Sequence, residues 1–182
     1  NLIGAPMARM AGVKRVFINQ NTAASMMPSW VKRLDKYLGT SRLVEAIVVN
    51  SRETSAEYDQ HPEAYVRKVH RIDHGFVPKR SRLDRDEARR ALGLPPGVPL
   101  LGCVGRLHPQ KNLEAAIKIL PHDRSWHLAI AGQGTKKPML DSIAYRLDCA
   151  DRVHFLGELG SSGVGDFLAA LDAFLFPSVA ET

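Results

Sequence analysis

Short apolar runs alternate with amphipathic segments along almost the whole chain, and this alternation limits the possible folds more than any other feature. The runs at 46–49 and 100–104 are apolar throughout, which is typical of strands covered on both faces of a parallel sheet. Between the strands, apolar residues recur at helical spacing, as at Leu113, Ile117 and Leu120. Successive strand–helix units require right-handed crossovers, so the sequence predicts an α/β chain with parallel sheets.

The pattern predicts two such sheets, and therefore two Rossmann-like domains at 1–78 and 99–182. Expected strands lie at 14–19, 46–49, 69–72, 100–104, 126–131, 153–156 and 173–176. Expected helices lie at 30–37, 112–120, 136–147 and 164–171. Another helix should begin at a cap at 50–53 and run to about Tyr65, and a short one should follow the cap pair Asp84 and Glu87. A Pro- and Gly-rich stretch, GLPPG at 93–97, follows the short third helix, and we place a linker at 79–98.

Both domains are expected to be incomplete. The chain stops at Thr182, just past its last strand, where a parallel sheet would lack its covering helix. The first domain has only about three strands, and the chain does not begin with Met. We therefore expect a fragment of a longer protein.

Composition excludes several classes of protein. Of 182 residues, 45% are hydrophobic and 24% charged, which excludes a disordered tail, a fibre and a low-complexity linker. No apolar run approaches the roughly 18 residues of a membrane span, and the start NLIGAPMARM does not resemble a signal peptide. Neither Cys103 nor Cys149 has a partner at metal-ligand spacing, so we expect reduced thiols in a cytoplasmic protein.

The positive charge lies in the first half of the chain. Residues 1–80 carry 13 Lys and Arg against 7 Asp and Glu, whereas residues 81–182 carry 12 of each. This asymmetry fits an anionic partner of the first domain, and it fits a solvated basic face equally well. A nucleic-acid partner is disfavoured, because no basic stretch is interleaved with aromatic residues.

Three loops that follow strands carry residues suited to a nucleotide. VGRLHPQKN at 104–112 offers Gly105 for close backbone approach, with Arg106 and Lys111 as cations for a diphosphate beside a helix N-terminus. AGQG at 131–134 is a tight turn that lacks the full GxGxxG pattern. FPSVAE at 176–181 ends in Glu181, whose carboxylate can accept hydrogen bonds from a polyol.

Each loop alone also fits a plain surface turn or capping loop. Ligands of open parallel sheets bind at the carboxyl ends of the strands, where all three loops would line one crevice. Cations, a glycine turn and a carboxylate in one crevice suit a nucleotide-sugar donor.

The ordered set VGRLHPQKN, AGQG, VHFLGEL and LDAFLFPSVAET resembles the second domain of retaining glycosyltransferases of family 4, which have the GT-B fold. Upstream, VVNSRETSAEY and RIDHGF resemble the end of that family's first domain. The resemblance extends from about Ala46 to Thr182. It implies transfer of a sugar from a nucleoside-diphosphate sugar to a glycan or lipid-linked acceptor, with retention of anomeric configuration.

The resemblance also implies roles for individual residues. Arg106 and Lys111 would bind the donor diphosphate, and Glu181 would contact the transferred sugar as the first Glu of a Glu-x7-Glu motif. Backbone near Leu159 would contact the base, and the turn at Gly132 and Gly134 would lie under the nucleoside. Because the two cations take the place of Mg²⁺, no metal and no cofactor are expected.

One position departs from the family pattern. Many members have a His just after the strand that corresponds to 16–19, near the reacting sugar, whereas Gln20 or Asn21 occupies that place here. An amide can hydrogen-bond a sugar hydroxyl but cannot exchange a proton near neutral pH. A retaining reaction of this kind needs no protein base, because the leaving phosphate oxygen can take the acceptor's proton.

Two other functions are compatible with the sequence: a nucleotide-sugar epimerase of the same fold, and a non-catalytic module that binds a polyanion. The order of the loops favours the transferase. Lys32, Arg33 and Lys36 share a broad face of the helix that begins at Trp30, so we expect this helix to contact an anionic acceptor or the inner face of the cell membrane. A merely solvated face is the alternative.

Overall fold

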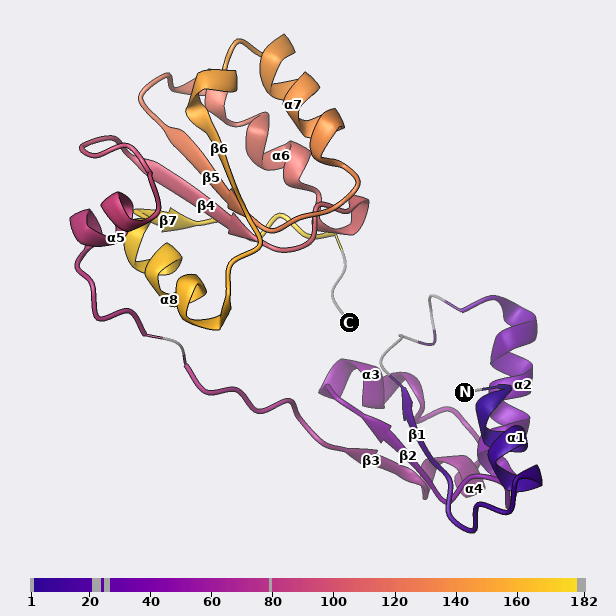
Figure 1. Cartoon of the computed structure of the whole chain (residues 1–182). Coiled ribbons are helices and arrows are strands. Elements are labelled where there is room, and N and C mark those ends of the chain that lie inside the picture. The colour runs from indigo at the N-terminus through magenta and orange to yellow at the C-terminus, as the bar shows by residue number, and fades with distance from the viewer. Residues whose placement is uncertain (1, 21–23, 25–26, 79, 180–182) are drawn as a thin grey trace. The chain divides into compact units, whose positions relative to one another are not determined.

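The computed structural model describes residues 2–20, 24, 27–78 and 80–179. The chain divides into two compact units, an N-terminal unit over residues 1–76 and a C-terminal unit over residues 77–181. Each unit contains one parallel sheet with helices packed against it (Figure 1). The predicted α/β class with two parallel sheets is therefore confirmed.

The N-terminal unit has a three-stranded sheet in the order β1–β2–β3. Its strands are β1 (Phe17–Gln20), β2 (Ala46–Val49) and β3 (Val69–Arg71), and its helices are α1 (Gly4–Met10), α2 (Ser29–Thr40), α3 (Arg52–Glu57) and α4 (Glu63–Val66). Ile18, Ile47 and Val49 of the sheet are buried together with the rings of Tyr58 and Tyr65.

The prediction of one helix that runs to Tyr65 is wrong in the length of the helix. The helix begins within the predicted cap, where Ser51 is the N-cap residue and its side chain accepts a hydrogen bond from the Thr54 amide. However, α3 ends at Glu57, and α4 begins only after Pro62. Proline lacks an amide proton and disfavours helical backbone in the residue before it, so a continuous helix cannot pass this point.

The C-terminal unit has a four-stranded parallel sheet in the order β6–β5–β4–β7. Its strands are β4 (Leu100–Val104), β5 (His127–Ala131), β6 (Val153–Gly157) and β7 (Ala173–Phe174). Its helices are α5 (Arg85–Ala91), η2 (Pro109–Lys111), α6 (Leu113–Ile117), η3 (Leu120–His122), α7 (Lys137–Arg146), η4 (Ala150–Arg152) and α8 (Ser161–Ala170). Because all strands are parallel, their carboxyl ends meet at one edge, and the arrowheads of β4, β5 and β6 point to it in Figure 1.

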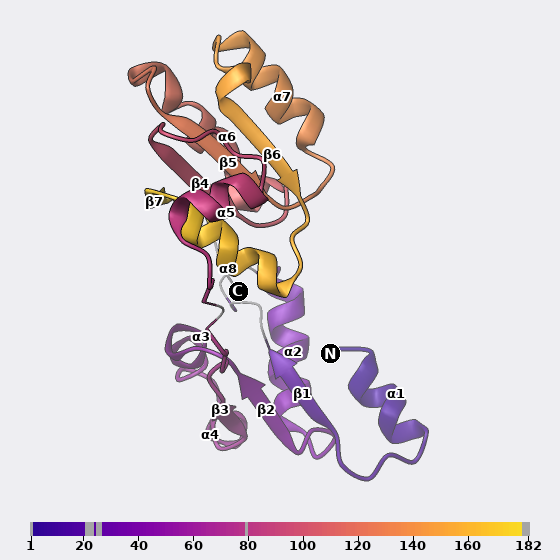
Figure 2. The ribbon, with the colours of Figure 1, turned by 60° about the vertical axis from the view of Figure 1, so that its left-hand side comes forward.

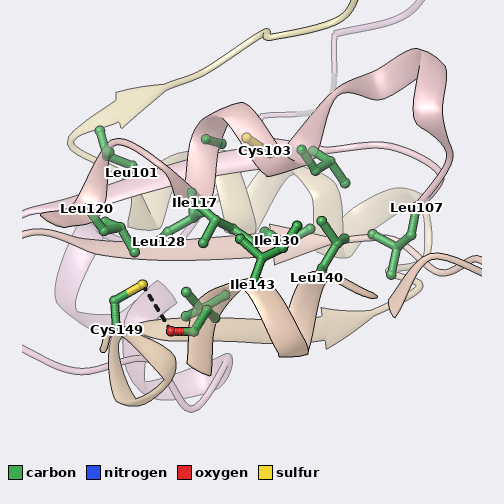
Figure 3. Packing of buried hydrophobic residues seen from close by; sticks show 14 residues of the cluster. Leu101, Cys103, Leu107, Ile117, Leu120, Leu128, Ile130, Leu140, Ile143 and Cys149 are labelled. Carbon is green, nitrogen blue, oxygen red and sulfur yellow. Dashed lines mark hydrogen bonds between the residues drawn. The ribbon is translucent and has the colours of Figure 1, made fainter. Parts of the chain in front are cut away.

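Helices cover both faces of this sheet. On one face, Ile117 of α6 and Leu140 and Ile143 of α7 pack against Leu128 and Ile130 of β5 (Figure 3). On the other face, α5 and α8 pack together against the sheet, as Figures 1 and 2 show from two sides. Because helices bury both faces of the sheet, its strands are apolar without interruption.

Residues 79–98 were predicted to form a linker, but in the structure they belong to the C-terminal unit. The predicted cap is present, since the Glu87 amide donates to Asp84 and the Asp84 amide donates to the Glu87 carboxylate. Ala88 and Leu94 are buried in the core that α5 shares with α8. Because α5 buries apolar surface there, it is part of the domain rather than a connector.

Two further findings concern the described residues. None of their helices is both long and apolar enough to cross a membrane. Cys103 and Cys149 are buried thiols, and burial raises the pKa of Cys103 to about 12. Cys103 is therefore a protonated core residue and not a nucleophile.

Candidate functional site

The loops after β4, β5 and β6 are tied to one another by backbone hydrogen bonds. The Gly105 amide donates to the Ala131 carbonyl oxygen at 2.9 Å, and the Gly132 amide donates to the Gly157 carbonyl oxygen at 2.6 Å. These bonds continue the sheet beyond the strands. The three loops are therefore held side by side at the carboxyl edge.

Gly132 and Gly134 allow the loop after β5 to lie directly against the loop after β4. A Cβ atom at Gly132 would lie 1.9 Å from the Gly105 carbonyl oxygen, and Gly132 has a φ of +143°. A Cβ atom at Gly134 would lie 2.6 Å from the Leu107 carbonyl oxygen. Backbone packing between loops thus requires both glycines, whatever else they contact.

A pocket of about 360 Å³ opens at this edge, between the ends of β4, β5 and β6 and the start of α8. This volume lies in the usual range for small-molecule sites, roughly 300–1,000 Å³. The pocket is lined by Val104, Gly105, Arg106, Ala131, Gly132, Gln133, Glu158, Leu159 and Val164. The structure thus brings together four predicted site residues from the loops after three strands: Gly105 and Arg106 after β4, Gly132 after β5 and Leu159 after β6.

The pocket combines apolar walls with charged groups. Leu159 and Val164 are partly buried, whereas the Arg106 and Glu158 side chains are exposed. The Gln133 side-chain amide donates to the Glu158 carboxylate across the ends of β5 and β6. Neither Gln133 nor Glu158 is among the site residues predicted from the sequence, although Glu158 follows a strand just as Arg106 does.

Lys111 lies beside the pocket rather than in its wall. Its aliphatic carbons come within 3.5 Å of the position that a Cβ of Gly105 would take, and its ammonium nitrogen lies 5.9 Å from the centre of the Phe176 ring. Phe176 belongs to the loop after β7, which is tied to the Lys111 segment because the Val179 amide donates to the Gln110 carbonyl oxygen at 3.0 Å. Lys111 thus lies between the loops that follow β4 and β7.

The helix expected from 112 to 120 is shorter than predicted. The 3₁₀ turn η2 precedes it, Asn112 takes the left-handed conformation with φ +48°, and α6 extends only from Leu113 to Ile117. Asparagine tolerates this conformation better than most residues. The cations Arg106 and Lys111 are therefore positioned by the loop and by η2, not by the first turn of a long helix.

Three other residues were predicted to belong to the site. Glu181 and Asn21 are outside the described residues. Gln20 ends β1 in the N-terminal unit, and only 4% of it is exposed. Its side-chain amide donates to Asp35 at 3.3 Å, and Asp35 also accepts a 2.7 Å hydrogen bond from the Tyr65 hydroxyl. The structure therefore shows Gln20 as a core residue.

The parallel sheet, with a pocket at its carboxyl edge, defines the C-terminal unit as a Rossmann-like domain. Residues 84–182, more than half of the chain, match the family described as glycosyl transferases group 1, and the chain belongs to this family.

Curated relatives agree with this assignment. The lipopolysaccharide core biosynthesis mannosyltransferase LpsB of Rhizobium meliloti is 31% identical over 75% of the chain and 39% of its own length. The GDP-mannose-dependent alpha-mannosyltransferase of Mycolicibacterium smegmatis is 32% identical over 59% of the chain and 26% of its own length. The chain therefore spans well under half the length of these relatives.

Solved structures show the fold. HepE of Anabaena, in complex with UDP-glucose, superposes with a TM-score of 0.79 and 22% identity over 98% of the chain and 51% of HepE. The lipopolysaccharide-biosynthesis glycosyltransferase WaaG superposes with a TM-score of 0.73 and 16% identity over 97% of the chain. The chain thus has the α/β architecture of GT-B glycosyltransferases, as predicted.

Proposed function

We propose that this chain is part of a glycosyltransferase that moves a sugar from a nucleoside-diphosphate sugar to an acceptor, with retention of anomeric configuration. The observation that carries the proposal is the pocket in which Gly105 and Arg106 meet Leu159 at one sheet edge, with Lys111 beside Gly105. The strand order β6–β5–β4–β7 supports one orientation of the donor in this proposal. Its base lies at Leu159, its diphosphate at Arg106 and Lys111, and its sugar toward the loop after β7, where Glu181 follows.

In the proposed reaction an acceptor hydroxyl forms a bond to the anomeric carbon while the bond from that carbon to the phosphate oxygen breaks. The departing phosphate oxygen takes the hydroxyl proton, so attack occurs on the face that the leaving group vacates. Arg106, with its planar fork of donors, and Lys111, as a point charge, offset the negative charge that develops on the nucleoside diphosphate. These two cations do this without a metal ion or cofactor in the proposal.

The relatives support the donor class and the type of reaction. Two of them are named as mannosyltransferases, one as GDP-mannose-dependent, and HepE was solved with UDP-glucose. Membership of a transferase family favours transfer over epimerisation and over simple polyanion binding. For the acceptor we propose a glycan or lipid-linked glycan used in polysaccharide biosynthesis.

Substitution of the two cations tests this function. Arg106→Ala and Lys111→Ala should each lower transfer about a hundredfold or more, because each removes a charge that stabilises the transition state. Arg146→Ala is the matched control, since Arg146 is exposed at the end of α7 and away from the pocket. Wild-type turnover by the double variant Arg106→Ala/Lys111→Ala would contradict the proposal.

A specific surface also supports contact with an anionic membrane. Trp30, Leu34 and Tyr37 of α2 are 62%, 46% and 72% exposed and recur at helical spacing on one face. Arg33 and Lys36, also exposed, lie next to them in the same turns. Aromatic and cationic side chains on one helix face suit the interface of an anionic bilayer, where each cation contributes about 1 kcal/mol.

Vesicle co-sedimentation tests the membrane proposal. The protein should bind vesicles of phosphatidylglycerol and phosphatidylcholine more strongly than vesicles of phosphatidylcholine alone, and added salt should weaken binding. Trp30→Ser with Tyr37→Ser should reduce binding, whereas Tyr145→Ser, an 80% exposed aromatic of the C-terminal unit, should not. Binding that ignores lipid charge and salt would refute the membrane proposal and leave the transferase proposal intact.

A further inference from the structure

Glu158 lies at the opposite end of the pocket from Arg106. Arg106 follows β4 and Glu158 follows β6, with β5 between them. Neighbouring strands are about 4.8 Å apart, so the two strand ends are separated by roughly 10 Å along the sheet edge. With the diphosphate at Arg106, as the proposed function has it, the ribose lies over β5 and the base reaches β6.

The surroundings of Glu158 suit a planar base. Leu159 and Val164 are partly buried and line the same end of the pocket. Leu159 also packs at the edge of the core that α8 shares with the sheet, which fixes its position. A flat apolar face can therefore contact these side chains while its polar edge meets the Glu158 carboxylate.

The carboxylate retains the capacity to accept hydrogen bonds from a ligand. Gln133 donates to one oxygen, Oε2, and so holds the Glu158 side chain across the ends of two strands. A carboxylate has about four acceptor positions on its two oxygens. Oε1 and the second lone pair of Oε2 can thus accept two further donors from one ligand edge.

We propose that Glu158 makes this pocket selective for the guanine base, so that the donor is a GDP-sugar. This inference rests on the proposed function. Guanine presents two adjacent donors, N1–H and the N2 amino group, which match the two oxygens of a carboxylate. Uracil presents one N–H between two carbonyl oxygens, and the carboxylate repels these oxygens. Adenine presents the N1 lone pair beside its amino group, and the carboxylate repels this lone pair as well. Glu158 therefore attracts guanine and disfavours the other two bases.

Calorimetric titration with GDP, UDP and ADP tests the inference. GDP should bind ten- to a hundredfold more tightly than UDP or ADP, which is about the discrimination that a bidentate contact to a base provides. Glu158→Gln should lower the affinity for GDP by a similar factor and leave the affinity for UDP unchanged. Glu158→Asp, which keeps the carboxylate, should recover part of the selectivity.

Glu63→Gln is the matched control, because Glu63 is an 81% exposed side chain in the N-terminal unit. Its affinities for all three nucleotides should equal those of the wild type. Since Glu158 is itself exposed, thermal unfolding should show that Glu158→Gln folds like the wild type.

The other outcomes separate this inference from the proposed function. Equal loss of GDP and UDP affinity in Glu158→Gln would mean that the carboxylate contacts the ribose, and would overturn base selection. Tighter binding of UDP or ADP than of GDP would also overturn it and leave a nucleotide-sugar transferase in place. If none of the nucleotides binds, the inference and the proposed function both fail.

Discussion

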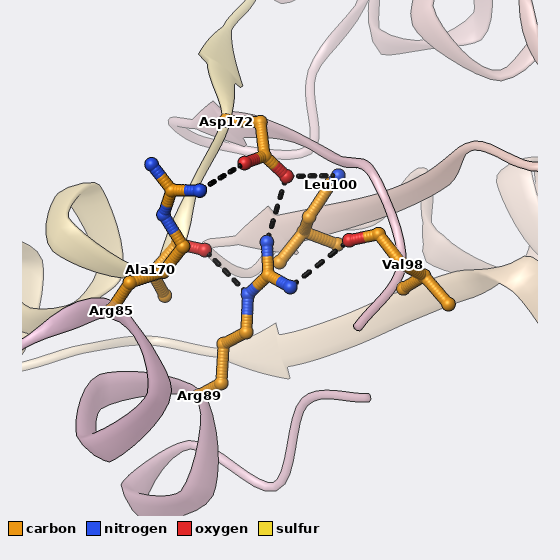
Figure 4. Close-up of polar contacts among 6 residues, drawn as sticks. All are labelled: Arg85, Arg89, Val98, Leu100, Ala170 and Asp172. Carbon is orange, nitrogen blue, oxygen red and sulfur yellow. Dashed lines mark hydrogen bonds and ion pairs between the residues drawn. The ribbon is translucent and has the colours of Figure 1, made fainter. Parts of the chain in front are cut away.

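The two units contain the same type of sheet but place their polar networks at opposite ends of it. In the N-terminal unit, Gln20, Asp35 and Tyr65 are joined at the carboxyl end of β1. In the C-terminal unit, the network of Arg89 and Asp172 lies at the amino end of β4, where Asp172 accepts a hydrogen bond from the strand's first amide (Figure 4). The carboxyl edge of the C-terminal sheet, at the other end of the strands from this network, contains the pocket.

The network of the C-terminal unit is structural. Arg89 is only 3% exposed, and its guanidinium donates to the Ala170 and Val98 carbonyl oxygens and to the Asp172 carboxylate, at 2.9, 3.0 and 2.7 Å (Figure 4). Asp172 also accepts the Leu100 amide at 2.8 Å. These contacts join α5, α8, β4 and β7 into one body.

Polar residues at strand ends are of two kinds in this protein. Gln20 is buried and its side-chain amide donates a hydrogen bond to Asp35 of another segment, so it contributes to the core. Arg106 and Glu158 are exposed in a pocket, so they can bind a ligand. The type of residue is similar in both units, and burial decides its role.

The largest expected effect comes from Asp172→Ala, which leaves the buried Arg89 charge without its carboxylate. The C-terminal unit should lose about 3–5 kcal/mol of unfolding free energy. Each unit contains one tryptophan, so denaturation of a Trp30→Phe background, followed by Trp126 fluorescence, reports the C-terminal unit. Asp141→Ala, which breaks only an exposed pair with Lys137, should cost about 0.5 kcal/mol, and equal losses would contradict the structural role of Asp172.

A smaller effect is expected from Gln20→Ala in the N-terminal unit. Because Asp35 loses a buried donor, unfolding followed by Trp30 should show a loss of about 1–3 kcal/mol, while Gln60→Ala, at an exposed amide, should show almost none. Nucleoside diphosphate affinity should not change. Unaltered stability together with lost sugar transfer would instead mean that Gln20 contacts the reacting sugar or the acceptor.

The smallest effect concerns pH. The rings of His127 on β5 and His154 on β6 are stacked 5.3 Å apart, and two of their nitrogens lie 3.0 Å from each other. Burial is the main cause that lowers the pKa of both imidazoles, with Arg152 adding to the effect at His127. The unfolded chain therefore binds more protons than the folded unit below a pH of about 6.5, the ordinary histidine pKa.

The stability of the C-terminal unit should accordingly be complete above about pH 6.5 and should decline as the pH falls toward the lowered pKa values. His154→Gln should flatten this decline in denaturation measured across that range. The exposed His122 provides the control His122→Gln, which should keep the wild-type slope. An unchanged slope in His154→Gln would mean that the pair does not control the pH dependence.

Much of the fold and half of the site follow from local sequence. Uninterrupted apolar runs identify β2 and β4, and parallel strands place their following loops at one edge, which is why Gly105, Arg106 and Gly132 are predicted to meet. The place of Leu159 beside them is predicted only by the family resemblance. The break at Pro62 is also visible in the sequence and should have ended the helix there.

The rest depends on contacts between distant segments. Whether Gln20 at the end of β1 is buried depends on Asp35 of α2 and Tyr65 of α4. The place of Glu158 depends on the pairing of β6 with β5, which brings Gln133 next to it. No local sequence pattern predicts the burial of Gln20 or the position of Glu158. A polar residue at a strand end has the same local sequence signature whether it is buried or lines a pocket.

Amide hydrogen exchange, with and without a saturating nucleoside diphosphate, tests most directly whether the carboxyl edge of the C-terminal sheet is the ligand site. Slower exchange is expected at 104–107, 131–134 and 157–162 when GDP is present, with little change at 18–20 and 48–52, the strand ends of the N-terminal unit. Slower exchange at the N-terminal strand ends, with none at the loops after β4, β5 and β6, would show that this edge is not the ligand site.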